Sequence, residues 1–225
     1  RVGAGGLEEV GQGGVVSGSV ISFGGQEVVS SGGKAVSATV SANGLLTVSS
    51  GGAAAGGLTL AGGRAVIAGE MAGGQIVVFK GPTAVLELHD LPQFHATISG
   101  MTGSGQKIDL RSFAFSAGES VSWTQSGTSG TLTLSGGFQV ARLTLIGSYA
   151  TSDFNLAGDG KGGTVVSDAP ASNGVAPSGR AAPLVQAAAG LHGGRYTAGL
   201  PVAGGGRTDS VAALPIAPAL STSSR

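Results

Sequence analysis

The 225-residue chain contains no cysteine, little charge and no long apolar run. The absence of cysteine excludes disulfides, thiolate metal sites and cysteine nucleophiles. Only 11% of the residues are charged, and 12 acidic side chains balance 12 basic ones, so the chain has no electrostatic footprint for nucleic acid or an anionic membrane. No apolar run reaches the roughly 18 residues that suggest a membrane-spanning helix, and we expect no membrane insertion.

The sequence begins at Arg1 and its first methionine is Met71. We therefore expect it to be a piece of a longer polypeptide, whose signal peptide or membrane anchor could lie outside these residues. The absence of cysteine suits export through a cell envelope, although many cytosolic proteins share it.

Glycine is abundant, with 44 residues, and its spacing over the first part of the chain is regular. The turn-forming positions Gly5, Gly24, Asn43, Gly62 and Gly81 are separated by equal intervals along the sequence. A second series with the same period, Gly13, Gly32 and Gly51, follows behind the first, and a longer third interval leads to Gly73. Such a period is typical of a solenoid in which each repeat forms one coil with turn residues at its corners.

Alignment of the repeats produces columns of similar residues. One column is aliphatic throughout, with Val10, Val29, Val48, Ile67 and Leu86; two neighbouring columns read Ile21, Val40, Thr59, Val78 and Val20, Thr39, Leu58, Val77. The segments around these columns are rich in Val, Thr and Ile and are too short for helices. We predict an all-β fold for residues 1–81, a flattened parallel β-solenoid with two strands in each 19-residue coil.

Residues 82–168 have a different composition, with most of the phenylalanines and the single tryptophan. Alternating patterns predict a hairpin from 120–125 and 131–134 around a turn at 126–130, a strand at 138–145, and shorter strands at 108–110 and 164–166. Bulky aromatic side chains find no room inside a thin solenoid, so we predict a β-rich extension that closes its end. Residues 169–225 are dominated by Ala, Pro, Gly and Ser, which predicts a linker or disordered tail.

The segments Val29-Ser30-Ser31-Gly32-Gly33-Lys34-Ala35 and Val48-Ser49-Ser50-Gly51-Gly52-Ala53-Ala54 resemble the strand-loop-strand repeats of AIDA-type autotransporter passengers, which are bacterial surface adhesins. The resemblance covers roughly residues 5–81. It implies a secreted or cell-surface β-solenoid, outside the bacterial outer membrane, that promotes adherence or aggregation. Some family members carry O-linked heptoses on repeat serines, and the matching residues here are Ser30, Ser31, Ser49 and Ser50. A purely structural interpretation is that these hydroxyls hydrogen-bond the turn backbone.

The first repeat departs from this motif at Gly11 and Gln12, and the fourth departs at Ala68 and Gly69. Residues 82–168 are similar to a module that follows such repeats in large exported bacterial proteins, through segments at 98–100, 107–110, 130–133, 145–149 and 159–164. That module implies no activity. The expected partner is an extracellular or cell-surface ligand, with self-association as a second form of binding.

Parallel β-solenoids also include carbohydrate lyases and hydrolases, so a carbohydrate-active enzyme is the alternative function. Glu8 and Glu27 share the fourth position of the repeat, where Leu46 and Ala65 follow. We expect the two glutamates to form a solvated surface ladder rather than a catalytic pair, and we predict that the chain is not an enzyme.

Two further patterns could suggest metal binding. Asp159-Gly160-Lys161-Gly162-Gly163 resembles a calcium nonapeptide, and a calcium-binding type I secretion module is another alternative. The motif occurs once and calcium prefers about six to eight oxygen ligands, so a turn is favoured. His89, Asp90 and His95 lie close together around Pro92, but their spacing is a weak metal signal. We therefore predict no metal and no cofactor.

Overall fold

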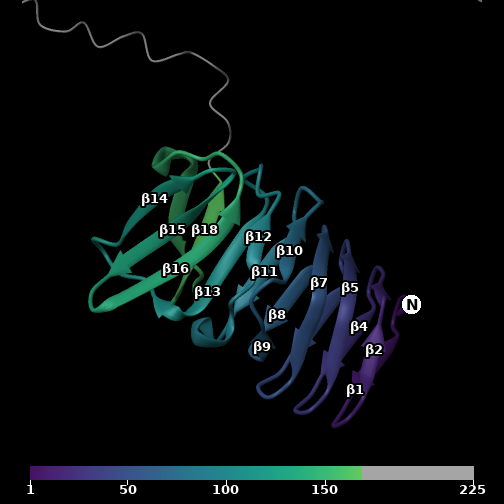
Figure 1. Ribbon diagram of the computed structural model, residues 1–225. Coiled ribbons are helices and arrows are strands. Elements are labelled where there is room, and N and C mark those ends of the chain that lie inside the picture. The colour runs from purple at the N-terminus through teal and green to yellow at the C-terminus, as the bar shows by residue number, and fades with distance from the viewer. Residues whose placement is uncertain (169–225) are drawn as a thin grey trace, which may run out of the picture. The chain divides into compact units, whose positions relative to one another are not determined.

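Two β-sheets build residues 1–168, the part of the chain that the computed structural model describes (Figure 1). The first sheet stacks six parallel strands in chain order: β1 (Leu7–Val10), β4 (Gln26–Val29), β6 (Leu45–Val48), β8 (Arg64–Ile67), β11 (Val85–Leu88) and β13 (Lys107–Ala114). The predicted all-β parallel solenoid is confirmed. The predicted linker at 169–225 lies outside the described residues.

The second sheet follows the same parallel order. Its strands are β2 (Val15–Ser17), β5 (Lys34–Ser41), β7 (Ala53–Ala61), β10 (Ile76–Phe79) and β12 (Thr97–Ser99), while β3 (Val20–Ile21) pairs with β5 and β9 (Glu70–Met71) pairs with β7. Each full coil therefore contributes to both sheets, as the two-strand pattern predicts.

The register shows where the period holds and where it changes. Leu7, Gln26, Leu45 and Arg64 are direct partners, so the first coils keep the period that the glycine spacing predicts. The next partners in this column are Val85 and Lys107, which lie farther along the sequence than the same period would place them. Parallel stacking thus continues beyond residue 81, and the later coils are longer than the first ones.

Three corners close each early coil, one more than the glycine spacing indicates. The first two are the predicted ones: the Gly5 N–H donates to the Gly24 carbonyl (3.1 Å), and the Gly13 N–H donates to the Gly32 carbonyl (3.0 Å). The third is formed by Gly18, Ser37 and Gly56, whose φ angles are 64°, 56° and 65°. It bends the second sheet where the pairing of β5 with β7 shifts register.

The expected column assignments need three corrections. The partner of Ile67 is Leu88 rather than Leu86, because the coil lengthens by two residues. The partners of Thr39 and Val40 are Thr59 and Leu60, rather than Leu58 and Thr59, because one extra residue at the third corner displaces the rest of β7. Gly73 belongs to the turn between β9 and β10, and Gly69 instead continues the second corner: a Cβ built there would lie 2.5 Å from the Ser49 carbonyl oxygen.

The core lies between the two sheets. It consists of stacked aliphatic side chains, among them the buried columns Val10, Val29, Val48, Ile67, Leu88 and Ile21, Val40, Leu60, Phe79. Phe79 is 3% exposed, so the expectation that aromatic rings find no room inside the solenoid is wrong at this position. The coils become longer in this part of the chain.

The C-terminal part of the described chain extends both sheets with antiparallel strands. β14 (Ser120–Ser126), β15 (Ser129–Gly136) and β16 (Gln139–Ile146) form a meander whose last strand pairs in parallel with β12. β17 (Phe154–Gly158) and β18 (Gly163–Asp168) form a hairpin that pairs antiparallel with β13. The predicted hairpin is confirmed, and the rings of Trp123, Tyr149 and Phe154 pack with centroids 5.2–5.8 Å apart. Two 3-10 turns complete the fold, η1 (Leu91–Gln93) and η2 (Thr151–Asp153).

Candidate functional site

The four candidate glycosylation serines lie together at the second corner of two adjacent coils. Ser30 and Ser49 follow the paired residues Val29 and Val48, so they occupy equivalent positions one coil apart. Ser31 and Ser50 are the next residues of the same turns. The structure therefore brings all four residues to one edge of the solenoid, in two parallel pairs, and we call this edge the serine corner.

The backbone of the serine corner is ordered without help from the serine hydroxyls. The Gly33 N–H donates to the Ser30 carbonyl (2.9 Å), and the Gly32 N–H donates to the Gly51 carbonyl of the next coil (2.8 Å). Gly32 has φ 76°, which suits the third residue of a turn that requires the left-handed region. Within residues 1–168 none of the four hydroxyls makes a hydrogen bond, and three of the serines are exposed while Ser49 is half-buried. The hydroxyls are available to solvent.

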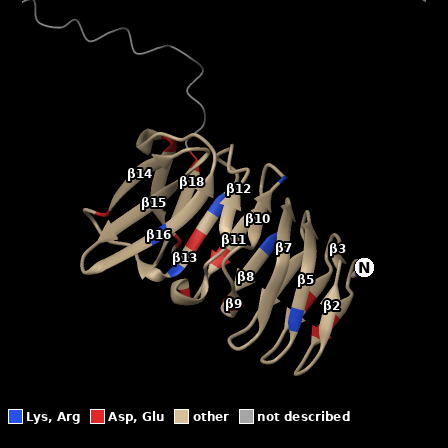
Figure 2. Ribbon diagram, viewed as in Figure 1, with Lys and Arg blue, Asp and Glu red and all other residues tan. Residues whose placement is uncertain are grey.

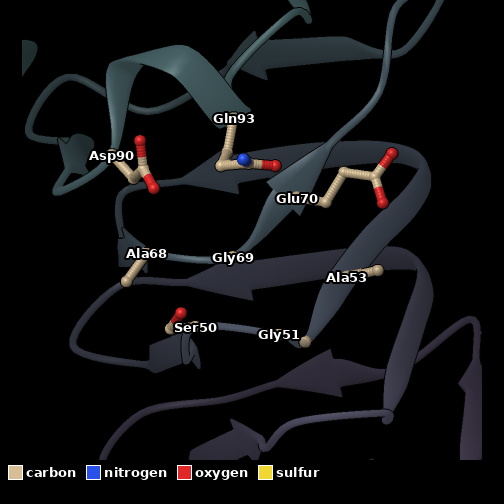
Figure 3. Close-up of a pocket in the computed structure, with 9 residues that line it drawn as sticks. Ser50, Gly51, Ala53, Ala68, Gly69, Glu70, Asp90 and Gln93 are labelled. Atoms are coloured by element: carbon tan, nitrogen blue, oxygen red, sulfur yellow. The ribbon is translucent and has the colours of Figure 1, made fainter.

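A shallow polar pocket of about 260 Å³ adjoins the serine corner (Figure 3). It exists because the fourth repeat replaces the four-residue turn by Ala68 and Gly69, which leaves a notch beneath η1. Ser50 lies on one side of this notch, and Asp90 and Gln93 lie on the other, with Glu70 at its end. The sequence departure at Ala68-Gly69 is the signal that could have located this pocket.

The Glu8–Glu27 ladder does not lie on the surface. The two residues are direct partners in β1 and β4, as expected, but Glu27 is completely buried and Glu8 is half-buried. Each glutamate lies two positions before an inward-facing valine. Because side chains alternate between the two faces of a strand, both glutamates also face inward. Burial is the main cause that raises the pKa of Glu27, and the charge of Glu8 raises it further. The expectation of a solvated ladder is therefore wrong.

Charged residues of the later coils lie on the adjacent strands β8, β11 and β13 (Figure 2), and their side chains contact one another across the first sheet. Glu87 is 4% exposed and accepts a hydrogen bond from Arg64 of the preceding coil. His89 Nε2 lies 2.6 Å from Glu87 Oε1, and Arg111 Nε lies 3.6 Å from the same oxygen. The contacts of Glu87 with Arg64 and Arg111 connect three successive coils across the sheet, and the glycine spacing of the sequence does not predict them.

Asp109 is the partner of Glu87 on the adjacent strand of this face. Burial raises the pKa of Asp109, and the charge of Asp159 raises it further. Arg111 donates to Asp159, which links the face to the hairpin of β17 and β18. Glu87 and Asp159 are bound to neighbouring cations, an arrangement that holds coils together, whereas Asp109 makes no ion pair within residues 1–168 and its Oδ1 is buried without a hydrogen-bond partner.

The remaining candidate residues do not converge. Asp159 Oδ1 accepts hydrogen bonds from the N–H groups of Lys161 (2.6 Å) and Gly163 (2.8 Å), so the glycine-rich motif forms a turn closed by its own aspartate. His89 contacts Glu87, whereas His95 lines a separate hollow with Arg142. Among residues 1–168 no three His, Cys, Asp or Glu side chains gather as a metal site.

That same part of the chain contains no helix of the length and apolarity needed to cross a bilayer. Comparison with known proteins produced no match to a family model, to a curated protein or to a solved structure.

Proposed function

We propose that this chain is a non-catalytic structural and adhesive segment of an exported bacterial protein, displayed at the cell surface or secreted. It promotes adherence or aggregation through a repetitive solenoid edge. The observation that carries the proposal is the serine corner, where Ser30, Ser31, Ser49 and Ser50 present unbonded hydroxyls at equivalent positions of stacked coils. The resemblance of these repeats to AIDA-type passengers agrees with it.

The mechanism is geometric. Adjacent strands in a sheet are about 4.8 Å apart, so equivalent side chains of successive coils recur at that spacing. One coil offers only a few polar contacts, and its individual affinity is low. The two serine-bearing coils on one rigid edge act as linked binding sites, and their combined avidity can exceed the single affinity by about 100-fold or more.

Glycosylation of the serine corner would extend this surface. Ser30, Ser31 and Ser50 are exposed, and their turns are held by backbone hydrogen bonds, so a sugar on each hydroxyl leaves the fold intact. The resemblance implies an O-linked heptose. Intact-mass measurement of the full chain, produced with and without a protein O-heptosyltransferase, tests this point, and peptide mapping assigns each modified serine.

The adhesive function is tested with the full chain immobilised on beads at graded density. We expect bead adherence to epithelial cells, or bead clumping, to rise more steeply than linearly with density because binding is multivalent. Replacement of Ser30, Ser31, Ser49 and Ser50 by alanine should reduce it. The matched control replaces four exposed serines of the extension, Ser112, Ser120, Ser122 and Ser148, and should leave binding unchanged.

The absence of binding in this assay would contradict the adhesive function. Beads that neither adhere nor clump at any density, with or without the sugar, contradict the proposal. Release of oligosaccharides from acidic or neutral polysaccharides would instead support a carbohydrate-active enzyme. The enclosed position of Glu27 supports the non-catalytic proposal, because its carboxylate is inaccessible to a polymer.

A further inference from the structure

Three polar side chains meet inside the first two coils, where the rest of the core is apolar. Glu27 is 0% exposed and Ser19 is 4% exposed. Neither carboxylate oxygen of Glu27 makes a hydrogen bond, and neither does the Ser19 hydroxyl, within the described part of the chain. Burial raises the pKa of the Glu27 carboxyl, and the nearby Ser19 hydroxyl lowers it by less than burial raises it. Glu8, the strand partner of Glu27, completes the group.

Such a group requires an explanation, because buried polar atoms in native proteins almost always have partners. A buried carboxylate is normally paired with a cation or coordinates a metal ion. Arg64 and Arg111 are committed to Glu87 and Asp159 in later coils, and Lys34 is exposed. The charge of the Arg1 amino group lowers the pKa of Glu27, but Arg1 is exposed and forms no ion pair with Glu27. Protonation would remove the charge of Glu27, but a neutral carboxyl still carries a donor and an acceptor that need partners.

We propose that Glu8, Glu27 and Ser19 bind a hard divalent cation inside the solenoid. Carboxylate and hydroxyl oxygens are the ligand type that calcium and magnesium prefer. Two carboxylates supply two negative charges, which match the charge of the ion. Glu8 is half-buried and Glu27 fully buried, so Glu8 is the ligand of the proposed site that is closer to solvent.

The coil register limits the site to these coils. The next residues in the column of Glu8 and Glu27 are Leu46 and Ala65, both completely buried and apolar. The site is also distinct from the turn at Asp159, whose carboxylate is satisfied by Arg111 and by backbone N–H groups. The proposal does not depend on the adhesive function.

The experiment measures the thermal unfolding midpoint of the full chain in chelator and in calcium or magnesium, together with isothermal titration calorimetry. A ligand that binds only the folded state raises the midpoint with its concentration. We expect one ion per chain and a rising midpoint for the native sequence, with the two ions compared in separate titrations. Glu27→Gln should abolish the response, and Ser19→Ala should weaken affinity about tenfold or more, since even indirect ligand partners contribute that much.

The matched control is Glu9→Gln, because Glu9 lies next to Glu8 on β1 but is exposed. It should retain the full response. Three outcomes overturn the proposal: no response of the native chain to either ion, an equal response of Glu27→Gln and Glu9→Gln, or a response abolished by Asp159→Asn instead. If Glu27→Gln fails to fold, the Ser19→Ala titration decides in the same way.

Discussion

Replacement of Gly33 by alanine tests how closely the coils stack at the serine corner. A Cβ at Gly33 would lie 2.9 Å from the carbonyl carbon of Val10 in the preceding coil and 3.0 Å from the Gly11 oxygen, and closer still to the Val10 oxygen. The Val10 carbonyl cannot turn away freely, because it accepts the Ser30 N–H at 2.9 Å. The added methyl therefore has to push two coils apart.

The size of the effect follows from these contacts. Non-bonded carbon atoms prefer separations of about 3.5–4.0 Å, so the coils must separate locally by a large part of an ångström. Strain from an added methyl typically costs about 1–3 kcal/mol. The displaced hydrogen bonds from Ser30 to Val10 and from Lys34 to Gly14 each contribute about 0.5–1.5 kcal/mol. We expect Gly33→Ala to lower the free energy of unfolding by about 3 kcal/mol or more.

Gly14→Ala is the matched control, because Gly14 occupies the equivalent position of the first coil. Its Cβ would meet only groups of its own turn, the Gly11 oxygen at 3.0 Å and a Val10 methyl at 3.2 Å. Both substitutions stiffen the unfolded chain equally, so that effect cancels in their difference. We expect Gly14→Ala to cost about 1 kcal/mol or less, the low end of the range for overpacking.

The measurement is urea denaturation of the full chain followed by far-ultraviolet circular dichroism. Repeat structures can open locally, so hydrogen exchange of β1 and β4 is measured alongside it. Agreement of the two variants within about 0.5 kcal/mol, the usual scatter of such comparisons, together with equal exchange rates, would refute the close stacking of these coils.

Three further predictions have defined outcomes. Leu60→Ala removes a completely buried core side chain and should cost about 2–5 kcal/mol in urea denaturation, whereas Val15→Ala, at a side chain 66% exposed, should change stability by less than about 0.5 kcal/mol. Burial is the main cause that raises the pKa of Asp168, and the charge of Asp153 raises it further. The folded state therefore keeps this proton to a higher pH than the unfolded state, and stability falls as pH rises from the ordinary carboxyl pKa to the raised one. Asp168→Asn should remove this part of the pH dependence of the unfolding midpoint. Glu87→Ala should lower the free energy of unfolding by about 1–2 kcal/mol, because the partners of Glu87 are only partly buried. High salt should reduce this loss of stability relative to the native chain, and an equal loss in high salt would contradict an ionic origin.

The period of the solenoid could be read from the sequence because each corner imposes its own requirement. Gly32 needs the left-handed region, and Gly33 needs to be free of a Cβ, so the two glycines recur together. Changes of coil length were harder to detect. An insertion of two residues keeps the same side chains facing inward, so Leu86 and Leu88 fit the aliphatic column equally well by pattern.

The candidate site was only partly predictable for a related reason. Residue type suggests that Glu27 faces solvent, while its position two residues before Val29 places it inside. Strand alternation was the available signal, and it outweighs residue type here. The pairing of Arg64, Glu87 and Arg111 depends on the lengths of the two later coils, which differ from each other and from the early period.

The late return of β16 to β12 has a consequence for the order of folding. Ile98 pairs with Val77 of the preceding coil on one side and with Leu145 on the other, and the second partner is more than twice as far away along the chain. Chain-closure entropy adds only about 0.7 kcal/mol for that difference, yet the meander from β14 to β16 must complete its own hairpins before it can dock. The coils can therefore assemble successively, and the edge of β12 stays unpaired until β16 docks. During synthesis, this unpaired edge is open to pairing with another copy of the chain.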